Sequence, residues 1–98
     1  MLDQEETAME RLPDGSIDQG LAELSGWQRK ANAIRKEYRF ADFLQALAFV
    51  NHIGSLAEEA NHHPDIELGW GRVAVSLSTH DAGGVTERDL ALARRIDG

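Results

Sequence analysis

One long stretch, residues 41–60, repeats its apolar side chains at three- and four-residue steps and holds no proline. That spacing places the apolar side chains on one broad face of an α-helix. Gly54 is the one weak spot within it. A chain of 98 residues has no room for a second core, so we expect this helix to bury its face on a sheet within a single domain.

The segments that flank this helix change to strand-like patterns. Residues 27–30 and 33–40 predict a β-hairpin, because the second arm alternates apolar and charged side chains. Beyond the helix, residues 66–68 predict a short strand and residues 72–79 predict the clearest strand of the chain. Four short strands with short connections favour an antiparallel sheet.

Two shorter helices are predicted near the ends of the chain. Ser16 can cap a helix over residues 17–24, and Thr86 can cap the last helix, where Asp89 completes a capping box. The resulting order of elements is α-β-β-α-β-β-α. We therefore expect an α+β fold in which the helices pack on one face of a four-stranded antiparallel sheet.

Domain layout and composition narrow the class of protein. Residues 16–98 are expected to form the single domain, after a polar and loosely held tail over residues 1–15. The chain has no cysteine, which excludes a disulfide framework and a thiolate nucleophile. Its net charge of −7 disfavours binding to nucleic acid or to an anionic membrane. No apolar run approaches the ~20 residues of a membrane span and the first residues do not resemble a secretory signal, so a cytoplasmic protein is expected.

Three of the four histidines lie next to the ends of predicted elements. Asn61 suits the left-handed position after the long helix, and Pro64 prevents that helix from continuing. His62 and His63 therefore fall in the turn between them, and His80 falls just beyond the end of a strand. Histidine is the side chain that gives or takes a proton near neutral pH, so this placement marks a candidate site.

Three interpretations compete for these histidines. They can be helix-terminus and loop residues without a function, which their spacing alone would favour. They can bind a metal, although adjacent side chains in an extended turn point apart and rarely share one ion. They can also form a metal-free acid–base pocket, in which Glu58, one turn before His62, and Asp89, at the start of the last helix, orient the imidazoles.

The spacing of these residues resembles a known family. Glu58-x-x-x-His62-His63-Pro64, followed at fixed distances by Trp70, His80 and Asp89, is similar to the signature of pterin-4a-carbinolamine dehydratases. The similarity extends over roughly residues 16–97, with further matching segments at residues 26–27, 77–80 and 87–93. One departure is Asn61, where relatives often carry Asp.

The resemblance implies a reaction and a set of site residues. Members remove water from 4a-hydroxytetrahydrobiopterin to give quinonoid dihydrobiopterin, which recycles the cofactor of aromatic amino acid hydroxylases, and they use no metal or organic cofactor. The catalytic residues would be His62, His63 and His80, supported by Glu58 and Asp89. The pterin would be bound by the three histidines together with Asn61, Ser78, Thr79, Asp81 and Trp27. The preferred assignment gives the two proton transfers to His62 and His80, and pterin binding to His63; which histidine protonates the hydroxyl stays open.

Two further expectations concern partners. Some proteins that resemble this fold are transcription-factor dimerisation partners or assembly chaperones, so a non-catalytic interaction protein is the alternative function. The broad apolar face of the helix over residues 41–60 and an exposed sheet edge predict a homo-oligomer: a homodimer paired across a sheet edge, with a homotetramer through the long helices as the other arrangement.

Overall fold

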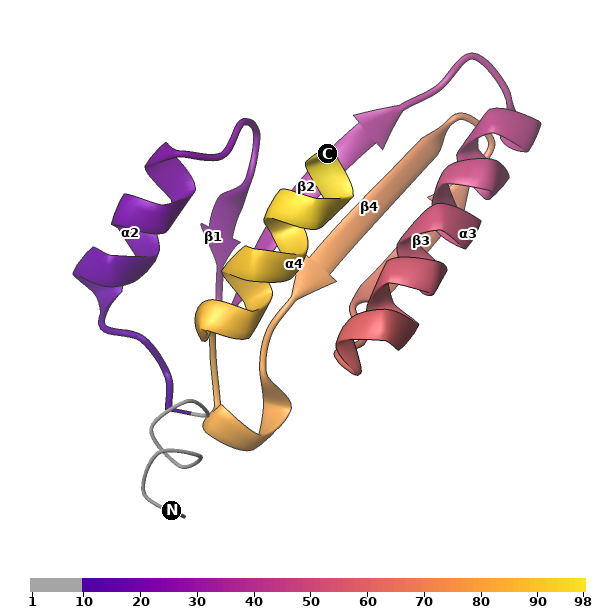
Figure 1. Cartoon of the computed structure of the whole chain (residues 1–98). Helices are drawn as coiled ribbons and strands as arrows, with labels where there is room; N and C mark the ends of the chain where they lie inside the picture. The colour runs from indigo at the N-terminus through magenta and orange to yellow at the C-terminus, as the bar shows by residue number, and fades with distance from the viewer. Residues whose placement is uncertain (1–9) are drawn as a thin grey trace.

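The computed structural model describes residues 10–98 and follows the expected order of elements (Figure 1). Its helices are α2 (Asp14–Ala22), α3 (Phe43–Ala60) and α4 (Glu87–Asp97), with a short 3₁₀ helix, η1 (His80–Ala82). Its strands are β1 (Gln28–Lys30), β2 (Ala33–Arg39), β3 (Asp65–Gly69) and β4 (Arg72–Leu77). The predicted α+β class and the predicted order are both confirmed. Of the tail expected over residues 1–15, residues 1–9 lie outside the described part.

The sheet is antiparallel throughout, in the order β1-β2-β4-β3. Figure 1 shows the three helices on the same face of this sheet, with α4 between α2 and α3. In the register of β2 and β4, Ile34 lies opposite Leu77 and Tyr38 lies opposite Val73. Because strand side chains alternate between faces, this register turns Ile34, Val73, Val75 and Leu77 towards the helices.

The core lies between the sheet and the helices. Helix α3 contributes Ile53 and Ala57, and α4 contributes Leu90 and Ala93, all buried. Helix α2 adds Ile17 and approaches α4 so closely that a Cβ on Gly20 would lie 2.6 Å from the Leu90 side chain. One core thus joins the three helices to the sheet.

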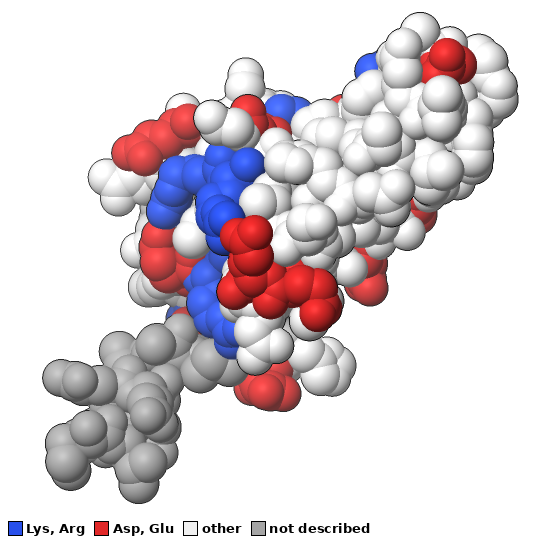
Figure 2. Space-filling model, turned by 45° about the vertical axis from the view of Figure 1, so that its right-hand side comes forward, with Lys and Arg blue, Asp and Glu red and all other residues white. Residues whose placement is uncertain are grey.

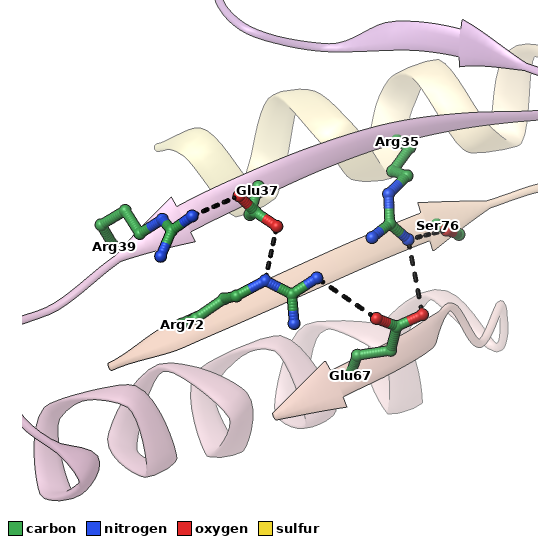
Figure 3. A network of polar contacts seen from close by, with 6 residues as sticks. All are labelled: Arg35, Glu37, Arg39, Glu67, Arg72 and Ser76. Atoms are coloured by element: carbon green, nitrogen blue, oxygen red, sulfur yellow. Dashed lines mark hydrogen bonds and ion pairs between the residues drawn. The ribbon is translucent and has the colours of Figure 1, made fainter. Parts of the chain in front are cut away.

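The other face of the sheet carries a charged ladder instead of helices. Figure 3 shows its members in a row across β2, β4 and β3: Arg39, Glu37, Arg72, Glu67, Arg35 and Ser76. Glu37 accepts hydrogen bonds from both Arg39 and Arg72, which are opposite each other in the register. The Arg72 guanidinium holds the pKa of the Glu37 carboxyl below its usual value, and Arg35 does the same for the pKa of Glu67.

Several element boundaries are shifted by one to three residues from the predictions, among them the start of α2 and the end of β4. Helix α2 begins at Asp14 with Pro13 at its N-cap, so the prediction that Ser16 caps it was wrong. Pro13 supplies an extended N-cap with a fixed φ of −61°, and its carbonyl accepts from the backbone N–H groups of Ser16 and Ile17. Strand β4 ends at Leu77, after which Thr79 makes an isolated bridge with Gly84.

Candidate active site

The site begins at the C-terminal end of α3. Asn61 takes the left-handed conformation, with φ 51° and ψ 45°, and the His62 N–H donates to the carbonyl of Ala57. The helix therefore ends where the sequence predicts. Asparagine suits this position because it tolerates the left-handed region better than most residues. The turn sends the chain away from the helix axis, so His62 and His63 leave α3 in different directions.

His62 is buried and faces α4. Its Nε2 lies 2.5 Å from Oδ1 of Asp89, whose side chain is fully buried. The second oxygen of Asp89, Oδ2, accepts from the Thr79 hydroxyl at 2.9 Å and from the Thr86 N–H at 2.8 Å. Since a carboxylate only accepts, the contact assigns the hydrogen to Nε2 of His62 and leaves Nδ1 as the nitrogen not engaged with Asp89.

His63 lies outside this buried network. Its Nε2 is 2.6 Å from Oε2 of Glu58, and both side chains are largely exposed. The sequence placed Glu58 one helical turn before His62, where a continued helix would have brought the two together. The left-handed turn at Asn61 ends the helix first, and Glu58 therefore meets the next histidine along the chain.

His80 approaches from the opposite element. It is the first residue of η1, three residues after the end of β4, and it is exposed. The loop that carries it is closed by the backbone pair of Thr79 and Gly84. The Thr79 hydroxyl contacts both Thr86 and Asp89, so the base of the His80 loop and the start of α4 share one buried polar cluster.

A cavity of about 290 Å³ gathers most of the predicted residues. It is lined by Asn61, His62, His63, Ser78, Thr79, His80, Asp81 and Arg88. Glu58 and Asp89 are not part of the lining, but each contacts one of the lining histidines. Apart from Trp27, the sequence-based set is thus brought together by the end of α3, the segment after β4 and the start of α4.

Arg88 lines this cavity but was missing from the predicted site. The sequence offered a signal for it, because a cation in the first turn of a helix is disfavoured by the helix dipole and needs another partner. Arg88 stands in that turn of α4, and its Nη2 donates to the carbonyl of Asn61 at 2.7 Å.

Trp27 does not line this cavity. Its ring is buried in the core, edge-on to Tyr38, and its Nε1 donates to Oδ2 of Asp97 at 2.9 Å. Trp70, which the motif also contains, is exposed in the turn between β3 and β4. Within this chain the indole of Trp27 therefore anchors the end of α4, and the prediction that it binds the pterin has no support from its position.

Residues 10–98 lack the features of two other kinds of site. No group of three or more His, Asp or Glu side chains there is arranged to hold a metal ion. No helix in the same range is long and apolar enough to cross a membrane.

Known proteins match this chain over most of its length. The profile of the family described as "Pterin 4 alpha carbinolamine dehydratase" matches residues 10–98. A protein of Thermomicrobium roseum named "Putative pterin-4-alpha-carbinolamine dehydratase" is 51% identical over 90% of this chain and 95% of its own length. A protein of the same name from Roseiflexus sp. is 49% identical over 89% of this chain and 94% of its own.

Solved structures agree with these matches. A structure described as a transcriptional coactivator/pterin dehydratase from Brucella melitensis aligns with a TM-score of 0.86 at 36% identity, over 90% of this chain and 96% of that one. A pterin dehydratase-like protein identified as a RuBisCO assembly factor in the alpha-carboxysome aligns with a TM-score of 0.60 at 29% identity, over 72% of this chain and 82% of its own. By profile, by relatives and by fold, the chain belongs to the pterin-4a-carbinolamine dehydratase family.

Proposed function

We propose that this protein removes water from 4a-hydroxytetrahydrobiopterin and releases quinonoid dihydrobiopterin. In this reaction the C4a–O bond breaks, the leaving hydroxide takes a proton and departs as water, and N5 loses its proton as the C4a=N5 double bond forms. The observation that carries the proposal is the single cavity lined by His62, His63 and His80. Two proton transfers at neighbouring atoms need two such groups, and imidazole serves as donor or acceptor near neutral pH.

The three imidazoles differ in their surroundings, which supports a division of labour. The ring of His62 is held by Asp89 and is buried, so it is the most fixed of the three. His80 is exposed on the opposite element and can exchange its proton with water. We assign the two proton transfers to these two residues. His63, whose ring is held by the exposed Glu58, is assigned to binding and polarising the pterin.

The remaining lining residues offer polar groups for the pterin ring. Asn61, Ser78 and Asp81 present amide, hydroxyl and carboxyl groups at the cavity, and they are proposed to bind the substrate. The Thr79 hydroxyl is already engaged with Thr86 and Asp89, so we assign its side chain to holding the site in place. No metal or organic cofactor is needed for this chemistry.

The experiment that tests this function is turnover of 4a-hydroxytetrahydropterin by the purified protein in the presence of a chelator. We expect dehydration well above the uncatalysed rate, unchanged by the chelator. A pure protein that stays inactive until zinc is added would contradict the proposal and support the metal interpretation.

A second proposed role is protein interaction. The two solved structures described above are named for a coactivator and for an assembly factor, each a property of that protein. On this chain, α3 exposes three apolar residues, Phe43, Leu44 and Leu47, and Figure 2 shows a wide uncharged area on the side where α3 lies.

We propose that this surface pairs with a second copy, giving a homodimer or a homotetramer, and that the protein works in the cytoplasm. Light scattering that shows a monomer at micromolar concentration would contradict the oligomer.

A further inference from the structure

Two consecutive residues of α4 hold the turn that carries His62 and His63. Asp89 contacts the ring of His62, and Arg88 donates from Nη2 to the backbone carbonyl of Asn61. Consecutive residues on a helix point about 100° apart, so these two side chains reach the turn from different directions. One anchors an imidazole, and the other anchors the peptide group directly before it.

The carbonyl that Arg88 contacts lies where the helix itself supplies no donor. Carbonyl groups in the last turn of a helix lack an intrahelical donor, and Asn61 is the left-handed residue that follows α3. A charge-assisted hydrogen bond of 2.7 Å to this carbonyl is stronger than one between neutral groups. The contact also gives the Arg88 guanidinium a hydrogen-bond acceptor in a helix turn whose dipole disfavours its charge.

We propose that Arg88 is a positioning residue, which fixes the Asn61–His63 turn against α4 so that His62 and His63 face the cavity at a set distance from His80. This inference rests on the dehydratase function proposed above and adds a residue to it. Its effect is expected on turnover more than on substrate affinity, because a displacement of about 1 Å at a catalytic group costs on the order of 10²-fold in rate.

The test compares Arg88→Ala and Arg88→Lys with Arg95→Ala. Arg95 is a matched control, because its Nη2 also joins α4 to α3, through Glu59 at 2.6 Å, and it does not line the cavity. We expect Arg88→Ala to lower kcat by about 10- to 100-fold with little change in KM, a loss typical of residues that orient a catalytic group. Arg88→Lys, which keeps a charged donor, is expected to recover part of the loss, and Arg95→Ala to stay near normal.

A second readout does not depend on turnover. The imidazole resonances of His62 and His63 are recorded by NMR in the substrate-free protein, with a melting curve for each variant to confirm folding. The proposal expects both sets to move in Arg88→Ala and to stay in place in Arg95→Ala. If Arg88→Ala fails to fold, Arg88→Lys replaces it. The imidazole resonances of His62 and His63 should then move in Arg88→Lys and stay in place in Arg95→Ala.

The outcomes separate this inference from the proposed function. Resonances that move in the Arg88 variant, in a protein that does not accelerate dehydration, uphold the positioning role and reject the enzymatic function. Resonances that stay in place reject the positioning role whatever the turnover. A change in KM alone would also overturn it, since Arg88 would then act as a substrate contact.

Discussion

Asp89 holds His62 with one carboxylate oxygen and caps its own helix with the other. The same side chain therefore fixes where α4 begins and which way the imidazole points. Thr86, the N-cap residue, joins the arrangement from the other side through its backbone N–H. Helix start and imidazole cannot be displaced independently, which makes Asp89 the most informative position for mutation.

Asp89→Asn is expected to lower turnover by about 10²-fold or more, because its amide N–H₂ would face Nε2 of His62 and favour the other ring tautomer. The loss of the charged capping box should also lower the free energy of unfolding by about 0.5–2 kcal/mol. Thr86→Ala is the control, since it removes cap interactions and keeps the carboxylate. Urea unfolding should show a stability loss in both variants, and kinetics should show a large activity loss only in Asp89→Asn. If the two variants kept equal activity, the Asp89 carboxylate would only support the fold.

His62→Ala and His80→Ala are each expected to lower kcat by ~10²–10⁴, the range for loss of a general acid or base. His63→Ala should mainly raise KM, because its assigned role is to hold the pterin. His52, an exposed residue of α3 away from the cavity, serves as the control for histidine removal. Near-normal turnover in folded His62→Ala and His80→Ala would mean that neither imidazole moves the protons.

Tyr38 provides a pH-dependent test of the fold. Burial, and then the hydrogen bond and charge of Asp97, raise the pKa of its hydroxyl well above its ordinary value of about 10. The folded state keeps this proton longer than the unfolded state, so the contribution is complete below pH ~10 and falls as the pH rises beyond it.

The measurement is unfolding from neutral to alkaline pH in the natural protein and in Tyr38→Phe. We expect the variant to be less stable near neutrality, because the bond to Asp97 is lost, and to lose less stability above pH ~10. Tyr38 is the only tyrosine of the chain, so tyrosinate absorbance reports its ionisation directly. Ionisation near its ordinary value in the folded protein would contradict the prediction.

Replacing Gly54 should increase the stability of the protein. A Cβ at this position would meet nothing within 4 Å, and the residue lies within α3. Gly54→Ala is therefore expected to stabilise the protein by up to about 1 kcal/mol through helix propensity. Gly71→Ala is the opposite case, because its Cβ would lie 2.7 Å from the carbonyl oxygen of Phe40. Denaturant midpoints should shift in opposite directions, and a shift of the same sign would show that local space does not decide the effect.

Leu44 tests the proposed oligomer. Its side chain is 73% exposed on α3, so Leu44→Glu should leave the fold intact and place a charge on the apolar surface. We expect light scattering to give a smaller assembly for the variant than for the natural protein. An unchanged mass would show that the contact surface lies elsewhere, for example along a strand edge.

Two of the three helix-end signals in the sequence predicted local structure correctly, because their effect does not depend on distant residues; the third, Ser16, does not cap α2. Thr86 with Asp89, and Asn61 before Pro64, both mark helix ends that the structure contains. The pairing of acids with histidines was beyond local reasoning. Which acid meets His62 depends on how the turn at Asn61 redirects the chain and on where α4 packs, and both are tertiary properties.

Trp27 is a second residue whose position depends on tertiary contacts that its local sequence does not reveal. A tryptophan near a predicted pocket fits a pocket rim and a core equally well in sequence terms. The structure places it in the core, where Asp97, far along the chain, accepts its indole N–H. Asp97 also accepts from Lys36 and Tyr38, which explains how a lysine is tolerated on the helix-facing side of β2.

The charged ladder on the helix-free face also limits how copies of this chain can assemble. Stacking two such faces would strip water from Arg35, Glu37, Arg72 and their neighbours, and desolvating ion pairs costs more than their attraction usually returns. Each charged side chain of the ladder already has an ion-pair partner within the same sheet, so stacking would remove solvation without supplying a missing partner. Growth by sheet stacking is thereby disfavoured, and association is directed to the helix layer and the strand edges.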